Sequence, residues 1–298
     1  MEKEKTAFLN EVSFTISSFA LQAILYEVSC FPSPGLVSPV SNGAHKDMDY
    51  FTFMDSTAVL SKYLTLFVQQ GYSNQAYQDI FNNIRAIGIE AEKDMFKKTK
   101  GINTHKGMLF LMGVACAAAG KAVYEKKAFG EVRNIITKMT EGLVENELLT
   151  LVNKPELSHG EKIYLKYKNE GIRGEVERGI PTVFQYSLEL FKQNADLSLN
   201  DRLVHTLIGI MATCNDTTII HRHNVDTLES VKEKARCIIE MGGMKSAQGR
   251  SQIEKMCQEF IAENISPGGS ADLLGLTVFL YLVEQYMDGN KTISVKKN

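Results

Sequence analysis

Apolar residues recur at the spacing of an α-helix along almost the whole chain, and this period limits what the chain can fold into. Between residues 6 and 29, for example, Phe8, Val12, Ile16, Phe19 and Ala23 lie close to the i, i+3, i+4, i+7 pattern. No convincing run alternates apolar and polar residues as a half-buried strand would. The sequence therefore predicts an all-α fold.

We expect about ten or eleven helices. They should form a single compact domain over residues 1–298, because no fixed-period repeat and no Pro/Ser/Gly-rich linker divides the chain. Ser158 and Asp226 each precede a glutamate by three residues, as in a capping box, and Pro181 suits a first helical turn. The expected helices span residues 6–29, 52–70, 75–97, 104–124, 130–151, 158–168, 181–193, 199–214, 227–241, 251–264 and 270–286.

The composition is that of an ordinary globular protein, with 44% hydrophobic residues, 23% charged residues and a net charge of −2. It excludes a disordered chain and gives no basic field for nucleic acid or a membrane surface. The 5 cysteines form no CxxC pair, so neither a disulfide framework nor a zinc knuckle is expected. The most apolar run, residues 107–120, is shorter than the roughly 20 residues of a bilayer span and predicts a buried core helix. With no targeting segment visible, we expect a cytoplasmic protein.

Polar segments interrupt the helical pattern in five places and concentrate the residues suited to chemistry. In the first, three prolines between residues 32 and 39 enforce a non-helical path before His45, Asp47 and Asp49. Two carboxylates at i, i+2 suit a magnesium ion that keeps several waters. The same residues fit a helix N-cap within a solvated charge cluster, and the spacing leaves both interpretations open.

The second segment, residues 101–107, leads into the most apolar run. Asn103 or Thr104 can cap a helix there, which places His105 and Lys106 in its first turn. Cations are unfavourable at this positive end of the helix dipole unless an anion binds, so the pattern favours a phosphate site. The alternative is an ordinary cap with exposed cations.

The third segment, residues 171–181, holds Arg173, Glu175 and Glu177 among three glycines and a proline. Arg173 has the forked donor geometry that suits phosphate. Either glutamate could be a general base or a metal ligand. A surface salt-bridge loop explains the same residues equally well.

The fourth and fifth segments follow the same theme. Residues 215–223 carry Asp216 and Arg222, and zinc is discounted because no third ligand accompanies the histidines at 221 and 223. In the fifth, the glycines at 268 and 269 let the backbone approach a ligand, Ser270 can cap a helix, and Asp272 either complements its dipole or binds a metal. Together the segments indicate an enzyme that acts on a nucleotide or another phosphorylated substrate.

The motifs Pro34–Val37, Asn42–Met48, Asn103–Gly107, Arg173–Glu175 and Ser266–Leu274 occur in this order over nearly the whole chain. In them the chain resembles the triphosphoribosyl-dephospho-coenzyme A synthase family, which makes the prosthetic-group precursor of citrate lyase or of malonate decarboxylase. The resemblance implies an all-helical, cytosolic enzyme. It also implies a glycosyl transfer: the 2′-hydroxyl of 3′-dephospho-coenzyme A attacks C1′ of the ATP ribose in one inverting displacement, and adenine leaves. The product would pass to a holo-acyl-carrier-protein synthase serving citrate lyase, with malonate decarboxylase as the alternative.

This resemblance gives each candidate residue an expected role. Glu175 is expected to be the base or oxocarbenium stabiliser, with Glu177 as its rival, and His45 to contact adenine or a phosphate. The expected ligands of a magnesium ion on the triphosphate are Asp47, Asp49, Asp216 and Asp272. The expected phosphate-binding residues are His105, Lys106, Arg173, Arg222, Gly268, Gly269 and Ser270.

The chain departs from the family's pattern at four positions. Ser33 and Ser38 stand where lysine and aspartate are usual, and His223 and Asn224 stand where two glycines are usual. The lost cation and the lost carboxylate either compensate each other or weaken activity. Two alternatives to the synthase are a magnesium-dependent nucleotide or ADP-ribose hydrolase and a non-catalytic, nucleotide-binding helical module.

Overall fold

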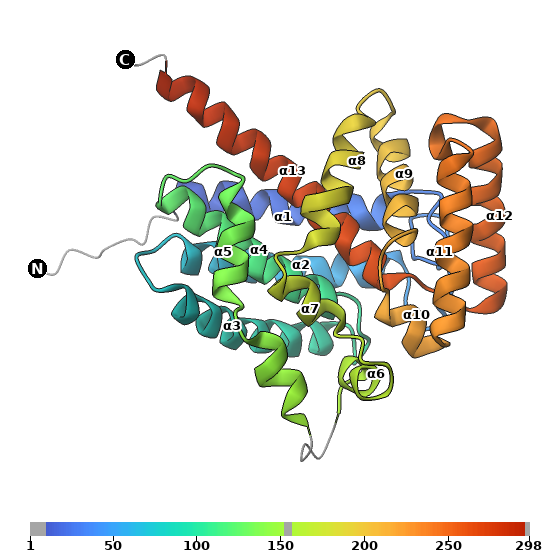
Figure 1. The fold of residues 1–298 in the computed structure, drawn as a ribbon, viewed down its shortest axis with the longest axis horizontal. Helices are drawn as coiled ribbons and strands as arrows, with labels where there is room; N and C mark the ends of the chain where they lie inside the picture. The colour runs from blue at the N-terminus through green and yellow to red at the C-terminus, as the bar shows by residue number, and fades with distance from the viewer. Residues whose placement is uncertain (1–9, 152–156, 296–298) are drawn as a thin grey trace, which may run out of the picture.

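The computed structural model describes residues 10–151 and 157–295 (Figure 1). Within these ranges there is no strand, only one isolated bridge between Ser38 and Ser41, so the prediction of an all-α fold is confirmed. A continuous cluster of buried apolar side chains extends from Ile16 to Met287. The two halves of the described chain therefore share one core.

Two helices from the first half of the chain form the centre of this core, namely α2 (Tyr50–Gly71) and α4 (Lys106–Tyr124). They approach closely because a glycine lies at the crossing: a Cβ added to Gly71 would lie 1.8 Å from the carbonyl oxygen of Ala117. The helices packed around this pair are α1 (Glu11–Ser29), α3 (Tyr77–Lys98), α5 (Glu131–Met139) and α13 (Gly268–Val295).

The helix α4 contains the most apolar run of the sequence. Both α4 and α1 have the length and hydropathy of a membrane-spanning helix. In α4, however, 78% of the apolar window is buried inside the protein, compared with 44% in α1. The run is thus a core helix, as predicted.

The second half of the chain builds a group of shorter helices beside this core. Figure 1 shows α11 and α12 side by side at one end, and α13 leading from there across the molecule, with its far end projecting outward. The bounds are η1 (Glu145–Leu149), α6 (His159–Tyr167), α7 (Gly171–Glu177), η3 (Val183–Ser187), α8 (Leu188–Gln193), α9 (Leu199–Met211), α10 (Thr217–Arg222), α11 (Val225–Glu240), η4 (Gly243–Lys245) and α12 (Ala247–Glu263).

Most predicted helix boundaries agree with the structure to within a few residues, and the exceptions are local. The helix predicted over residues 130–151 is interrupted after α5 and resumes as the π-helix η1. The third and fourth polar segments contain short helices, α7 and α10, so the described chain has thirteen α-helices instead of ten or eleven. The capping box at Ser158 is confirmed. The one predicted at Asp226 is wrong, because Asn224 caps α11 by accepting from the Thr227 N–H at 2.8 Å.

Candidate active site

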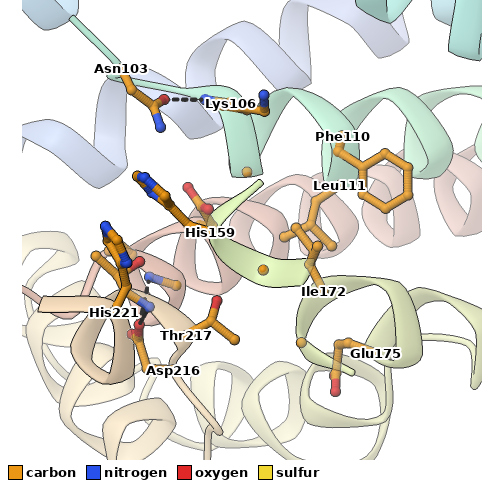
Figure 2. Close-up of a pocket in the computed structure, with 18 of the residues that line it drawn as sticks. Asn103, Lys106, Phe110, Leu111, His159, Ile172, Glu175, Asp216, Thr217 and His221 are labelled. Atoms are coloured by element: carbon orange, nitrogen blue, oxygen red, sulfur yellow. Dashed lines mark hydrogen bonds between the residues drawn. The ribbon is translucent and has the colours of Figure 1, made fainter. Parts of the chain in front are cut away.

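A cavity of about 1550 Å³ opens where the ends of several helices meet (Figure 2). Its wall includes residues from all five polar segments of the sequence: Asp47, Lys106, Glu175, Asp216 and Asp272 are examples. The structure thus brings together residues that lie far apart along the chain. The volume exceeds the roughly 300–1,000 Å³ of an ordinary small-molecule site, so the cavity has room for two ligands of that class.

The first and fifth segments form one edge of the cavity by packing on each other. Gly35 has a φ of +71°, and a Cβ there would lie 2.0 Å from the carbonyl oxygen of Ile265, so this close contact requires glycine. Beside it, His45 Nε2 lies 2.9 Å from Ser266 Oγ. Burial and the nearby Arg222 lower the pKa of His45, which favours a neutral ring at this edge.

The two aspartates that follow His45 differ in position. Asp47 lies at the rim with its side chain 64% exposed, 3.9 Å from His45 Nδ1. Asp49 does not line the cavity and instead caps α2, accepting from the Thr52 N–H at 2.8 Å while the Thr52 hydroxyl closes a capping box. The prediction of Asp49 as a magnesium ligand therefore loses its support, and the helix-cap interpretation holds.

Asp216 is the most heavily hydrogen-bonded carboxylate of the cavity. It is 1% exposed, and its Oδ1 accepts from the N–H groups of Thr218 at 2.9 Å and Ile219 at 3.4 Å, and from the Gly269 N–H at 3.2 Å. Its Oδ2 accepts from the Ser270 N–H at 2.7 Å and the Ser270 hydroxyl at 2.9 Å. Burial raises the pKa of Asp216, and these hydrogen bonds oppose the shift. A single carboxylate thus caps α10 and joins it to the N-terminus of α13.

This arrangement counts against three predicted roles. The Gly269 and Ser270 donors are engaged by a carboxylate of the protein itself, which takes the place that a phosphate was expected to occupy. Asp216, in turn, is surrounded by donors and presents no free side to a magnesium ion. Gly268 still lines the cavity beside Thr218, as its predicted role in binding requires.

Asp272 and Glu27 form a second acidic part of the cavity wall. The Asp272 carboxylate lies against the start of α4, because a Cβ added to Gly107 would come within 2.1 Å of its Oδ2. Burial raises the pKa of Asp272 well above its ordinary value, the charges of Glu27 and Asp216 add to this effect, and the Met108 N–H opposes it. Burial likewise raises the pKa of Glu27 to about 8.

Glu27 was not predicted as a site residue, although the sequence carries a signal for it. It lies on the same helical stripe as Ile16, Ala20 and Ala23, all of which are buried. An acidic residue on the buried stripe of a helix is the exception that indicates a functional role.

His105 lies at the first turn of α4 but does not offer a positive charge. It is 1% exposed, and burial lowers its pKa to about 4. Thr104 donates its hydroxyl hydrogen to Ser56 Oγ, and Ser56 Oγ lies 2.7 Å from His105 Nδ1. These contacts hold the ring through Nδ1, and the buried Nε2 has no hydrogen-bond partner among the described residues. Burial thus favours a neutral ring, and the role of His105 in phosphate binding stays a prediction.

Lys106, beside it, lines the cavity and forms an ion pair. Its Nζ lies 2.5 Å from Glu92 Oε1, and its backbone N–H donates to Asn103 Oδ1 at 3.2 Å (Figure 2). The expected N-terminal contact by Asn103 is thus present, and Lys106 remains suited to an anion.

Two arginines on different helices share one carboxylate. Glu147 in η1 lies 2.6 Å from Arg173 Nε and 2.7 Å from Arg85 Nη2, and both arginines line the cavity. Arg173 also lies 3.6 Å from Glu161. A guanidinium has five donors, so each arginine retains donors for a phosphate. The sequence singled out Arg173 but missed Arg85, which lies within the long helix α3, and Glu147, which lies in the short π-helix η1.

Arg222 provides a separate cation near His45. Its Nη2 donates to the carbonyl oxygen of Ala44 at 2.8 Å and to Asn264 Oδ1 at 2.6 Å. The neighbouring departure from the family pattern, His223, has its Nε2 3.1 Å from the carbonyl oxygen of Asn264. The chain uses His223, like the cap residue Asn224, for local structure.

The two candidate base residues on α7 are placed differently. Glu175 is half-buried and lines the cavity (Figure 2), and its Oε1 accepts from the Thr182 N–H at 2.8 Å. Glu177 is not among the residues that line the cavity. The structure thus favours Glu175 over Glu177 as a residue within reach of a substrate.

One further pair in the wall was missed in the sequence. His159 from α6 stacks on His221 from α10, with ring centroids 3.5 Å apart and planes inclined by 19° (Figure 2). Burial lowers the pKa of His221, helped by the charges of His159 and Lys162. No local motif links these two rings, because they are brought together only by the packing of α6 on α10.

Magnesium is expected from the resemblance, and the acidic residues are its candidate ligands. Within residues 10–151 and 157–295, no group of three or more His, Cys, Asp or Glu side chains is arranged to hold a metal ion. A closed protein cage is therefore not present there. Magnesium is commonly bound by one or two carboxylates together with substrate phosphates, and only that kind of site fits these residues.

An all-α fold encloses a large cavity lined by carboxylates and by basic side chains that suit anionic groups. The sequence profile of the ATP:dephospho-CoA triphosphoribosyl transferase family matches residues 13–291, and the chain belongs to that family. It is therefore a transferase.

Curated relatives agree with this assignment. The chain is 38% identical to a probable 2-(5″-triphosphoribosyl)-3′-dephosphocoenzyme-A synthase of Malonomonas rubra, over 93% of this chain and 90% of that protein. A relative of the same name in Lactiplantibacillus plantarum is 39% identical over 90% of this chain and 96% of its own. The protein CitXG of Leuconostoc mesenteroides subsp. cremoris is 37% identical over 94% of this chain, which covers 61% of that protein. No solved structure matches the chain.

Proposed function

We propose that this transferase makes 2′-(5″-triphosphoribosyl)-3′-dephospho-coenzyme A from ATP and 3′-dephospho-coenzyme A, with release of adenine. One observation carries the proposal: a single cavity of about 1550 Å³ gathers carboxylates and two separate groups of basic residues. Two nucleotide substrates, each with its own phosphates, need such a combination. The names of the relatives support the same reaction.

In the reaction, the 2′-oxygen of the acceptor bonds to C1′ of the ATP ribose while the C1′–N9 bond to adenine breaks, and the departing adenine takes up one proton, equal in number to the one that the hydroxyl loses. Glu175 takes the proton of the attacking hydroxyl, and its charge favours the oxocarbenium-like transition state. The Thr182 N–H holds the Glu175 carboxylate at 2.8 Å through one oxygen, which leaves the other for the hydroxyl. His45, at the cavity edge, contacts the adenine or a phosphate.

The basic residues position the triphosphate and do not cleave it. Arg85 and Arg173, oriented by Glu147, bind its oxygens together with Lys106. Arg222 lies on other elements and suits the phosphates of the second substrate. Magnesium, when bound, neutralises part of the triphosphate charge.

The product would serve the acyl carrier protein of citrate lyase through a holo-acyl-carrier-protein synthase in the cytoplasm. The same chemistry would serve malonate decarboxylase, and the cavity does not distinguish the two destinations. Purified protein with both substrates should convert dephospho-coenzyme A to a product heavier by one triphosphoribosyl group.

Adenine release with and without dephospho-coenzyme A tests this proposal against its alternatives. The synthase requires the acceptor, a nucleotide hydrolase releases adenine or another fragment without it, and a binding module releases none. Release that does not depend on the acceptor would refute the proposed transfer.

The base assignment is tested with Glu175→Gln, which keeps the size of the side chain but cannot accept the proton. We expect turnover to fall by about 10²–10⁴-fold at saturating substrates, with little change in ATP affinity. Glu177→Gln is the matched control on the same helix. If Glu177→Gln collapses while Glu175→Gln stays within a few-fold of the parent, the base has been misassigned.

A further inference from the structure

Glu27 is a buried carboxylate without a partner. It is 7% exposed and lines the cavity, and in the part of the chain that the structure describes no side chain or N–H donates a hydrogen bond to its carboxylate. An ionised carboxylate is costly to bury unless it is paired or binds a metal. Such a group is retained in a cavity wall when a ligand completes it.

The surroundings of Glu27 place a second carboxylate beside it. A Cβ added to Gly275 of α13 would lie 3.7 Å from the Glu27 Cβ, so the end of α1 packs on α13 one turn beyond Asp272. The Asp272 Oδ2 lies against Gly107 at the start of α4. The two carboxylates therefore belong to one small region where α1, α4 and α13 meet.

No cation pairs with either of these carboxylates in the described part of the chain: Lys106 at the start of α4 is paired with Glu92. Glu27 and Asp272 take part in no ion pair with a lysine or arginine among residues 10–151 and 157–295. The charge of Glu27 instead acts unfavourably on Asp272. Two uncompensated carboxylates provide hard oxygen ligands, the kind that magnesium prefers.

We propose that Glu27 and Asp272 together bind a divalent cation, magnesium, whose remaining positions are filled by triphosphate oxygens of the nucleotide and by water. This inference rests on the proposed function, because the ATP triphosphate supplies the other ligands. It replaces the ligand set expected from the sequence: Asp216 is saturated by donors, Asp49 caps α2, and Asp47 lies at the exposed rim.

The test compares the affinity for ATP in excess magnesium with that in excess chelator, by isothermal titration without the acceptor. The parent should bind ATP at least tenfold more tightly with magnesium. In Glu27→Gln this ratio should fall to about one, with ATP in chelator bound at least as well as by the parent, since glutamine adds no negative charge to the cavity wall. Paramagnetic resonance of Mn²⁺ with ATP should show direct coordination of the bound ion by the protein in the parent, and coordination by ATP and water alone in the variant.

A matched control is Glu284→Gln on α13, the helix that carries Asp272. Glu284 is 17% exposed, but it is paired with Lys192 at 3.2 Å and does not line the cavity. In this control, the ratio of ATP affinity in magnesium to ATP affinity in chelator should equal that of the parent. If Glu27→Gln also keeps the parent ratio, the proposed site does not exist.

A second variant reaches the site without changing a ligand. Gly107→Ala would displace Asp272, because the new Cβ would lie 2.1 Å from Oδ2. It should lose the magnesium effect, whereas Gly130→Ala, where nothing lies within 4 Å, should keep it. Thermal unfolding in chelator checks folding: Glu27→Gln should be at least as stable as the parent, and a loss of stability would show a structural role and overturn the proposal.

The outcomes separate this inference from the proposed function. Parent protein that releases adenine with the acceptor, but whose magnesium ratio survives Glu27→Gln, refutes the metal site alone. Parent protein that shows the Glu27-dependent ratio, but transfers nothing to dephospho-coenzyme A, refutes the function alone.

Discussion

Asp216 is predicted to stabilise the fold by linking α10 to the N-terminus of α13, and replacing it with asparagine tests that role. The carboxylate accepts five hydrogen bonds from α10 and α13, and asparagine retains only one of its two oxygens. With the oxygen kept towards Thr218 and Gly269, the new amide group faces the Ser270 N–H, and two donors oppose each other. The Ser270 hydroxyl can rotate to accept instead.

The expected cost follows from these contacts. A hydrogen bond to a charged group contributes about 1.5–3 kcal/mol, and the interaction of a charge with a helix N-terminus about 0.3–1 kcal/mol at each of the two helices. Asparagine also relieves the burial of a charge, which offsets part of the loss. We therefore expect the free energy of unfolding to fall by about 2 kcal/mol in Asp216→Asn.

Urea unfolding in excess chelator measures this change, with an unaltered m-value as the sign that only stability has changed. Asp49→Asn is the comparison, since asparagine caps a helix as well as aspartate does, and it should differ little from the parent. If Asp216 were instead a metal ligand, its removal without metal would leave stability unchanged or raise it. An Asp216→Asn variant as stable as the parent would refute a stabilising role for Asp216 between α10 and α13.

Three further predictions concern the core and the basic residues. Gly71→Ala should lower the free energy of unfolding by about 2–3 kcal/mol, because its Cβ would lie 1.8 Å from the Ala117 oxygen. Gly88→Ala, where nothing lies within 4 Å, should raise it by up to about 1 kcal/mol, and urea unfolding compares the two variants. Burial lowers the pKa of His105 from 6.5 to about 4, so the unfolded chain takes up a proton at a higher pH than the folded chain does. The free energy of unfolding therefore decreases as the pH falls from about 6.5 to 4. Between pH 7 and 4.5, His105→Gln should lose about 2–3 kcal/mol less of its free energy of unfolding than the parent loses. Glu147→Gln should release both Arg85 and Arg173 and raise the KM for ATP about 10-fold with a smaller change in kcat, and an unchanged KM would exclude a positioning role.

The long helices could be predicted from the sequence because each buries a stripe of apolar residues at helical period. The short helices could not. In α7 and α10 the local sequence is rich in glycine or polar residues, and α10 is held by the contacts of Asp216 with α13, 53 residues away. Helices of one or two turns depend on such tertiary contacts and carry little signal of their own.

The candidate site was predictable where composition changes abruptly and hidden where it does not. Gly- and Pro-rich segments marked Asp47, Arg173 and Asp272, and the structure places all three in one cavity wall. Arg85 and Glu147 lie in segments whose sequence predicts ordinary helices, and their charges resemble those of any solvated helix face. The roles of Gly269 and Ser270 were misjudged for another reason: the sequence shows a free helix N-terminus but not which anion satisfies it.

The position of α13 has a consequence for the timing of synthesis. Its first turns carry Asp272 and the donors that hold Asp216, whereas nearly all other residues of the cavity wall precede Gly268 in the chain. During translation, the earlier helices can pack as they emerge, but Asp216 has no partner on α13 until that helix leaves the ribosome. The cavity is thus completed by a helix that is made after all the others that the structure describes, and a nascent chain that stops before α13 holds neither Asp216 nor Asp272 in its final place.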